Sequence, residues 1–285
     1  MPLGDRQEND LVHITLDVWQ DKVYYLGKEY PAGYFAAGVL NVSHNLFVTI
    51  TGEGGFLLDA YAIAKFGDRE QLEELLPVLW ESVENMLRSL RQVPPFSLWN
   101  MEAELGKMRA MLSKDHIDQL LDNPEEKMWF LAYLRAGILL PISIYHFVIA
   151  AWHLETYYLH RLGKRDETHF AVAFHDFYHD PSTKEVLEKM FAPTIEPFDA
   201  NPRLRSSYTF TRDPKDEKKM IFVNRVFFSS YMDFYVYDLL NGMHWGHAPS
   251  LCECCLKYFL TTDSHKSKYC DGMAPQNPHY TCRQY

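Results

Sequence analysis

The first regular pattern along the chain is an alternation of apolar and more polar residues from Val12 to Val18. A period of two residues is typical of a β-strand with one buried face. Residues 23–30 are also rich in strand-forming side chains, and Gly27 and Lys28 in their middle favour a turn. The sequence therefore predicts an N-terminal strand and a β-hairpin that pairs with it.

From Asp68 onward the apolar residues recur at intervals of three and four, which is the period of an amphipathic helix. These positions are Leu72, Leu76, Leu79, Val83, Met86 and Leu90. Asp68 and Gln71 match the pattern of a capping box at the start of this helix. Pro94 and Pro95 end the helix, and residues 101–121 predict a second one that stops at Asn123-Pro124.

Residues 136–154 contain no Asp, Glu, Lys or Arg over 19 positions, which is close to the length of a membrane span. Pro141, Ser143, His146 and His153 interrupt this stretch, however, and no second stretch of the same kind stands out. We therefore interpret residues 136–154 as a buried central helix and favour this over a membrane span.

The N-terminus and the overall charge restrict the cellular location and the binding partners that we expect. Residues 1–10 are polar and charged and lack the apolar core of a signal peptide, so we expect a cytoplasmic protein with no membrane partner. The formal net charge is -10 over 285 residues. Because nonspecific nucleic-acid binding depends on Lys and Arg neutralising phosphates, any nucleic-acid contact must be local.

Between residues 201 and 228 the charge reverses, because seven basic residues accompany only three acidic ones. Residues 208–211 and 220–226 predict two strands, and the polar segment 213–217 predicts the turn between them. This basic hairpin could hold a phosphate backbone. An ordinary solvated hairpin is the simpler interpretation, since most charged runs are solvated faces.

Two glycine-containing segments predict boundaries of secondary structure. Ser229 or Ser230 is placed to cap a helix that continues through Leu240, and Asn241-Gly242 predicts its end. Residues 52–55 read Gly-Glu-Gly-Gly but lack the Lys-Ser/Thr that follows in a phosphate-binding loop. We therefore expect a turn at residues 52–55.

Histidines gather in the second half of the predicted helical body. His146, His153 and His160 are spaced by seven, and His175 and His179 are spaced by four, as metal ligands on adjacent helical turns would be. Acidic neighbours in the sequence are Glu155, Asp176 and Asp180. This pattern permits a catalytic metal centre that activates water, but no complete motif such as His-Glu-x-x-His is present. Packing and hydrogen bonding in aromatic-rich helices is the alternative.

All five cysteines lie in the last part of the chain. Cys252 and Cys255 form a Cys-x2-Cys knuckle, Cys270 follows after 14 intervening residues, and Cys282 follows after 11 more. Structural zinc takes four ligands in a tetrahedron, with sulfur at about 2.3 Å. We therefore predict a structural zinc site on these four cysteines, with Cys254 left over.

Two alternatives to this set remain at the level of sequence. The cysteines could form disulfides or stay as free thiols, although a chain without a signal peptide is expected in a reducing compartment, where metal ligation is favoured. His265 and His279 are substitutes for the third or fourth ligand.

The residues around the cysteines carry a family resemblance. Residues 247–252, 257–260, 268–275 and 281–283 resemble the C-terminal module of a family of uncharacterised bacterial proteins. They are also distantly similar to the CGNR-type zinc finger of bacterial transcription regulators. The resemblance covers residues 220–285 and implies zinc on Cys252, Cys255, Cys270 and Cys282, together with a nucleic-acid role.

The chain departs from this resemblance in two respects. The tetrad Cys-Gly-Asn-Arg is replaced by Thr-Cys-Arg-Gln at residues 281–284. A helix rich in basic residues usually follows the last cysteine in such proteins, whereas only residues 283–285 follow here. We expect either that the native chain continues beyond Tyr285 or that the module closes without this helix.

The patterns together predict an α+β, mainly helical fold. Its expected parts are a helical body with an N-terminal hairpin over residues 1–200, a basic hairpin plus a helix over 201–245, and a zinc-binding module over 246–285. The preferred function is non-enzymatic: a zinc-stabilised bacterial regulatory or binding protein whose partner is a nucleic acid or another protein. The alternative is a metal-dependent hydrolase that uses the histidine-rich helices.

Overall fold

The computed structural model describes residues 11–66, 68–190, 201–213, 216–263 and 267–285, and it has the predicted α+β, mainly helical fold. The residues cluster into two compact units. Apart from undescribed residues, one unit contains Thr15–Asn41 and His146–Tyr285, and the other contains residues 11–14 and Val42–Tyr145. The consecutive limits 1–200, 201–245 and 246–285 stay a prediction.

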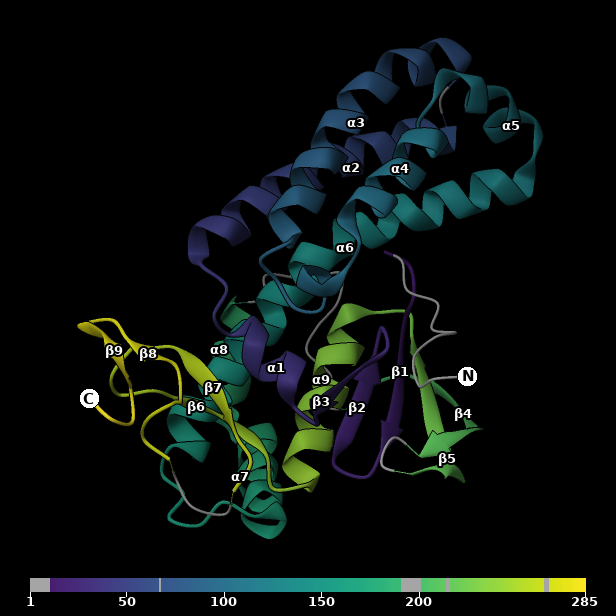
Figure 1. Cartoon of the computed structure of the whole chain (residues 1–285). Helices are drawn as coiled ribbons and strands as arrows, with labels where there is room; N and C mark the ends of the chain where they lie inside the picture. Colours follow the sequence, from purple (N-terminus) through teal and green to yellow (C-terminus); the bar gives the residue numbers. More distant parts are fainter. Residues whose placement is uncertain (1–10, 67, 191–200, 214–215, 264–266) are drawn as a thin grey trace. The chain divides into compact units, whose positions relative to one another are not determined.

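The first unit contains a five-stranded sheet in which three N-terminal strands meet two strands from residues 205–228 (Figure 1). Its order is β3-β2-β1-β5-β4. The bounds are Ile14–Trp19 for β1, Lys22–Tyr25 for β2, Lys28–Pro31 for β3, Arg205–Asp213 for β4 and Asp216–Phe228 for β5. The predicted strand, N-terminal hairpin and basic hairpin are thus confirmed. Leu26 and Gly27 both have positive φ, 48° and 75°, which suits the tight turn between β2 and β3.

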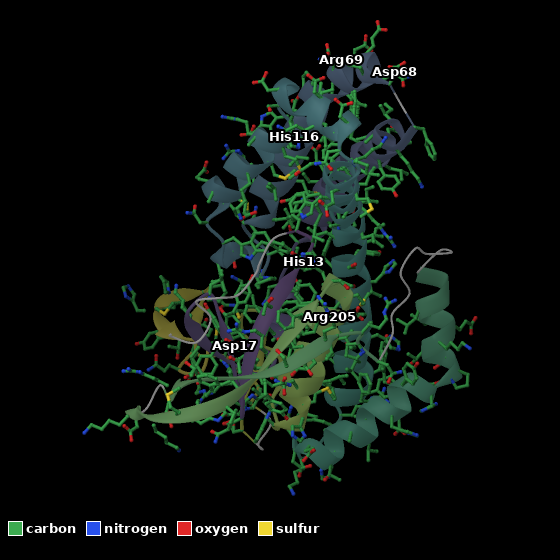
Figure 2. The ribbon with its side chains drawn as sticks, turned by 90° about the vertical axis from the view of Figure 1, so that its right-hand side faces the viewer. His13, Asp17, Asp68, Arg69, His116 and Arg205 are labelled. Atoms are coloured by element: carbon green, nitrogen blue, oxygen red, sulfur yellow. The ribbon has the colours of Figure 1, made fainter. Side chains whose placement is uncertain are left out.

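One buried ion pair links the two groups of strands. Asp17 on β1 is fully buried, and its two carboxylate oxygens accept hydrogen bonds of 2.7 and 2.8 Å from Arg225 on β5. Figure 2 labels Asp17, and it also labels Arg205 on the neighbouring strand β4. The paired geometry compensates the carboxylate for its loss of water. Nothing in the local sequence of either strand predicts this contact between distant segments.

Helix α9, Tyr231–His244, forms the centre of the first unit (Figure 1). Ser230 caps it as expected, because its hydroxyl oxygen accepts hydrogen bonds from the Met232 and Asp233 N–H groups. Phe234 packs against Phe228 of β5, with ring centroids 5.7 Å apart. On another side, Tyr235 stacks on Phe147 at 5.1 Å. The helix therefore joins the sheet to the neighbouring helices through a dense aromatic core.

The end predicted for this helix at Asn241-Gly242 is wrong, because α9 continues to His244. Gly242 is buried, and a Cβ placed there would lie 2.8 Å from the Cα of Gly33. Gly33 precedes α1, Tyr34–Val39, and has a φ of 88°. The glycine at position 242 thus permits close helix packing and does not terminate the helix.

Asp238 of α9 reinforces the same junction. Its carboxylate is fully buried and accepts hydrogen bonds from the N–H groups of Gly33 at 3.0 Å and Ala36 at 2.9 Å. Burial raises the pKa of Asp238 to about 6, although the backbone hydrogen bonds to it act in the opposite direction. The carboxylate satisfies N–H groups at the start of α1 that have no hydrogen-bond partner within the helix.

Helix α6 spans Pro124–Leu154 and contributes residues to both units. It contains the predicted buried stretch 136–154 and continues into a π-helical turn, η3, at Glu155–Leu159. The most apolar 18-residue stretch of this helix is 56% buried. The first unit is completed by α7, Glu167–His179, and α8, Pro181–Met190.

The second unit is helical. Its elements are α2 at His44–Phe66, α3 at Arg69–Leu90, η1 at Phe96–Leu98, α4 at Met101–Met111, η2 at Lys114–His116 and α5 at Ile117–Asp122, followed by the start of α6. The capping box at Asp68 and Gln71 is confirmed by reciprocal hydrogen bonds of 3.1 Å. The single helix predicted over 101–121 is wrong, because Leu112 leaves the helical conformation and a 3-10 turn intervenes.

The turn predicted at residues 52–55 is also wrong, because these residues lie inside α2. Apolar side chains before and after them are buried at helical spacing: Leu46, Phe47, Ile50, Leu57, Ala60 and Ala64. Packing of this face outweighs the low helix propensity of glycine.

Helix α2 is also a second candidate membrane span, which the sequence did not bring out. Of its most apolar 18-residue stretch, 29% is buried. Both α2 and α6 qualify by length and composition alone, as a buried core helix of that size does.

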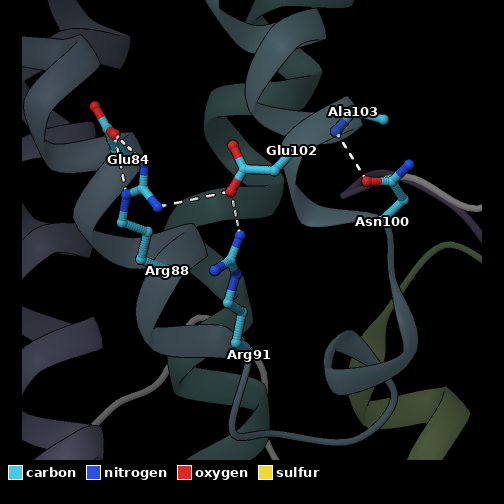
Figure 3. A network of polar contacts seen from close by, with 6 residues as sticks. All are labelled: Glu84, Arg88, Arg91, Asn100, Glu102 and Ala103. Carbon is cyan, nitrogen blue, oxygen red and sulfur yellow. Dashed lines mark hydrogen bonds and ion pairs between the residues drawn. The ribbon is translucent and has the colours of Figure 1, made fainter.

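Exposed ion pairs join α3 to α4 (Figure 3). Arg88 contacts Glu84 at 2.6 Å and Glu102 at 3.7 Å, and Arg91 also binds Glu102. Asn100 caps α4 by accepting a hydrogen bond from the Ala103 N–H at 3.3 Å. Because these side chains are solvated, the pairs add little to stability.

Candidate metal centre

The first two cysteines of the predicted site lie in the turn of a short hairpin. This hairpin consists of β6, Ala248–Leu251, and β7, Tyr258–Thr261. The Cys252 N–H donates to the Lys257 carbonyl at 2.9 Å, and the Leu256 N–H donates to the Cys252 carbonyl at 3.0 Å. Leu256 has a φ of 57°, which folds the chain back sharply. The turn therefore brings Cys252 and Cys255 to one side.

The other two cysteines flank a second hairpin, made of β8, Met273–Ala274, and β9, Asn277–Thr281. The Cys282 N–H donates to the Gly272 carbonyl at 2.7 Å and so fixes the end of β9. A Cβ at Gly272 would lie 3.3 Å from the Cys270 sulfur, so this position favours glycine. The Glu253 N–H donates to the Lys268 carbonyl at 2.9 Å and connects the two hairpins.

The structure gathers Cys252, Cys255, Cys270 and Cys282 so that their sulfur atoms all lie within 4.8 Å of one another. The Cys255 and Cys270 sulfurs are 3.6 Å apart. In a tetrahedron with zinc–sulfur bonds of about 2.3 Å, neighbouring sulfurs are about 3.8 Å apart. The four side chains therefore fit a tetrahedral metal site. All five cysteines are free thiols, so the disulfide alternative does not describe this arrangement.

The protonation of the cluster is uneven. Burial opposes the ionisation of Cys252, but N–H groups of Cys255, Cys270 and Cys254 donate hydrogen bonds to it and lower its pKa to about 6. Burial raises the pKa of Cys270 and of Cys282, and hydrogen bonding with the Cys252 and Cys255 thiols raises both further. A hydrogen bond from the Gly272 N–H opposes this at Cys270 and lowers its pKa. A divalent cation would reverse this preference, because metal binding requires thiolates.

The leftover residues lie outside the cluster. The Cys254 sulfur contacts the Gln276 side-chain oxygen at 3.6 Å and does not belong to the four-sulfur group. His279 is exposed on β9, and His265 lies outside the described residues. Among the residues that the structure describes, the four cysteines form the one group with metal-ligand spacing.

The cysteine module, which we define as residues 248–285, is attached to the rest of its unit by specific hydrogen bonds. Asn41 and Tyr258 exchange two of them, at 2.9 and 2.7 Å, between the Asn41 amide and the Tyr258 backbone. Arg165 is fully buried, and its guanidinium donates to the Pro249 carbonyl at 2.9 Å. These contacts hold β6 and β7 in place, whereas the cysteines lie beyond them at the turn and in the second hairpin.

The candidate histidines do not assemble into a comparable centre within the described residues. His146 is buried, and His153 contacts the Thr183 hydroxyl at 3.2 Å. Burial lowers the pKa of His153, although Asp180 opposes this. His160 lies 3.8 Å from the Glu155 carboxylate. These three histidines thus face different neighbours.

His175 and His179 are adjacent on α7, with ring centroids 4.5 Å apart, and they line a cavity of about 400 Å³. The cavity is also lined by His244 of α9, which the sequence analysis missed. His244 contacts the Glu167 carboxylate at 2.6 Å. No local pattern marks His244 as part of this cavity, because α7 and α9 are distant in sequence.

The basic hairpin is less basic than its composition indicates. Arg225 is paired with Asp17, Lys219 lies 3.6 Å from Asp213, and Arg203 lies 3.8 Å from Asp233. Three of the seven basic residues are thus engaged by acidic partners. Arg205 instead lies over the Phe227 ring at 5.9 Å.

Comparison with known proteins identifies one matching region. Residues 199–285 match the model of a family of unknown function, DUF6076. No curated protein and no solved structure matches the chain. The matched region includes the β4–β5 hairpin, α9 and the cysteine module, so one family model spans all three. The similarity to CGNR-type fingers stays a prediction.

Proposed function

We propose that this chain is a zinc-stabilised bacterial binding protein of the regulatory type, with one structural zinc ion on Cys252, Cys255, Cys270 and Cys282. The observation that carries the proposal is the convergence of four sulfur atoms within 4.8 Å. Four thiolates complete the tetrahedral coordination of zinc and leave no open position for a substrate or a water molecule. The ion therefore has a structural role.

The proposed partner is a nucleic acid. Support comes from the local excess of basic residues in an otherwise acidic chain. A regulatory protein of this kind needs a local cationic surface and not a positively charged body. A four-thiolate zinc site requires reduced cysteines, so we also propose a cytoplasmic location, where the compartment is reducing.

Metal analysis combined with limited proteolysis tests the zinc part of the proposal. Purified protein should contain one zinc ion per chain. A chelator should make the cysteine module sensitive to protease, and added zinc should restore its resistance, because metal binding contributes directly to folding. Protein that lacks a bound metal, with a module equally resistant before and after chelation, would refute a structural zinc site.

A further inference from the structure

The β4–β5 hairpin carries three aromatic side chains on one exposed face. Tyr208, Phe210 and Phe222 have exposed fractions of 81%, 69% and 73%. Phe210 lies directly opposite Phe222, and Tyr208 lies opposite Asn224, so the register places them on the same side of the ribbon. Burial usually removes such rings from water. A group of exposed rings therefore marks an interaction surface.

Two positive side chains accompany the rings. Arg212 lies opposite Met220 on this side of the ribbon. Lys218 is exposed two residues before Met220, in the irregular part of β5 between the Arg212–Met220 and Asp213–Asp216 pairs. Within the described residues, no ion pair engages Arg212 or Lys218. No carboxylate occurs on this face among the strand positions 208–212 and 218–224. We call this surface the aromatic face.

The aromatic face is the uncovered continuation of a packed surface. Further along the same side of β5, Val226 and Phe228 are buried, and Phe228 contacts Phe234 of α9. Strand β5 has 13 residues, whereas its neighbour β1 has six. Figure 2 shows the β4–β5 hairpin as the long ribbon that carries Arg205. The rings thus lie on the exposed part of the same side of the hairpin.

We propose that the aromatic face binds single-stranded nucleic acid, with bases stacked on Tyr208, Phe210 and Phe222 and phosphates held by Arg212 and Lys218. This inference rests on the nucleic-acid part of the proposed function and specifies the form of the partner. Unpaired bases stack on aromatic rings with little regard to sequence, whereas the bases of a duplex are already stacked and paired.

A second copy of this chain is the competing occupant, and the charges disfavour it. Two aromatic faces meeting in a symmetric dimer would bring two positively charged surfaces together, which is electrostatically unfavourable. A polyanion gains from the same two charges. Charge complementarity therefore favours the nucleic acid.

Fluorescence anisotropy of the full chain loaded with zinc tests this inference. The probes are labelled oligothymidylate and oligouridylate of roughly 20 nucleotides, which exceeds the site size of most single-strand binding surfaces, and a duplex of equal length. Both single strands should bind more tightly than the duplex. The relative affinity for oligothymidylate and oligouridylate distinguishes a DNA from an RNA partner.

Substitutions then separate stacking from simple apolar contact. Phe210→Leu and Phe222→Leu keep much of the apolar bulk but remove the aromatic surface, and each should weaken single-strand binding about 5- to 150-fold. Phe210→Trp should retain binding. The control Val172→Ala changes an exposed apolar residue on α7 and should have no effect. Arg212→Gln and Lys218→Gln should each lower the salt slope by about 0.7.

Each negative result of these binding experiments would reject a different part of the proposal. Equal binding of duplex and single strands, unchanged in the leucine variants, would overturn stacking and leave a nucleic-acid partner. Zinc-loaded protein that binds no probe would overturn both the stacking and the nucleic-acid partner, while the structural zinc site would remain supported. A dimer that Phe210→Asp converts to a monomer, without probe binding, would assign the face to a second copy of the chain. Zinc content and thermal midpoint confirm that each variant is folded.

Discussion

The cysteine module and the surroundings of α9 belong to the same compact unit, yet they have different interiors. The buried cluster of the module consists of Cys252, Ala274 and Cys282, with partly buried neighbours. Around α9, the aromatic side chains Phe228, Phe234 and Tyr235 are all buried and pack against one another or against adjacent helices. The interior of the cysteine module consists mainly of thiols, and the interior around α9 consists mainly of aromatic rings.

This difference indicates which interaction holds each region. Apolar burial contributes roughly 25 cal/mol per Å², so a cluster of two cysteines and one alanine cannot offset the ordering of a segment with little regular structure. The strands of the module are also short, since β8 has two residues and β9 has five. A metal ion would therefore supply the free energy that the module lacks, whereas the α9 region needs none.

The largest expected effect is the loss of one metal ligand. Cys252→Ser should remove zinc and unfold the cysteine module while the sheet and α9 stay folded, because structural zinc in small domains binds with about 10–16 kcal/mol. Hydrogen exchange should report fast exchange in residues 252–285 and protected exchange in α9. Zinc content measured on the same sample should fall to near zero.

Cys254→Ser is the matched control for this substitution. Its sulfur lies outside the four-sulfur group, so zinc content and exchange should match those of the unmodified chain. If Cys254→Ser released the metal as completely as Cys252→Ser, the ligand set read from the geometry would be incorrect.

The cysteine cluster could be predicted from sequence because its signal is local. A two-residue knuckle constrains Cys252 and Cys255 directly, and four soft ligands imply a shared ion. The capping box at Asp68 and the cap at Ser230 were predictable for the same reason, since each joins side chain and backbone within three residues. Interactions between neighbours in sequence leave a readable pattern.

Features that depend on distant segments were missed or mistaken. Residues 52–55 looked like a turn because glycine favours turns, but the buried face of α2 decided their conformation. Gly242 looked like a helix end, although its small size serves the approach to Gly33, about two hundred residues earlier. The pairing of Asp17 with Arg225 had no local signal either. Tertiary packing overrides propensity at such positions.

Ion pairs offer a second test of the difference between the two regions. Arg225→Met should destabilise the sheet by about 3–5 kcal/mol, because it leaves the buried Asp17 carboxylate without its cation. Arg283→Met in the cysteine module breaks an exposed pair with Asp271 and should cost at most about 1 kcal/mol. Urea denaturation of both zinc-loaded variants measures the two effects. Equal losses would mean that burial does not distinguish these pairs.

A smaller expected effect than the loss of the buried ion pair concerns packing without charge or metal. Gly242→Ala would place a Cβ 2.8 Å from the Gly33 Cα, and since the three nearest atoms all belong to the backbone, α1 or α9 must shift. Overpacking of this kind typically costs about 1–3 kcal/mol. The unfolding midpoint of the α9 region should fall while zinc content stays unchanged, because the module is held by its metal.

Gly106→Ala gives the opposite expectation and completes this test. Gly106 lies inside α4 with open space around its Cα, so a methyl group meets no neighbour within 4 Å. Alanine should stabilise that helix by about 0.5–1 kcal/mol through its higher helix propensity. A stabilising effect of Gly242→Ala similar to that of Gly106→Ala would show that α1 and α9 do not approach as closely as their glycines permit. Opposite signs would support the close approach, because propensity alone favours alanine at both helical positions.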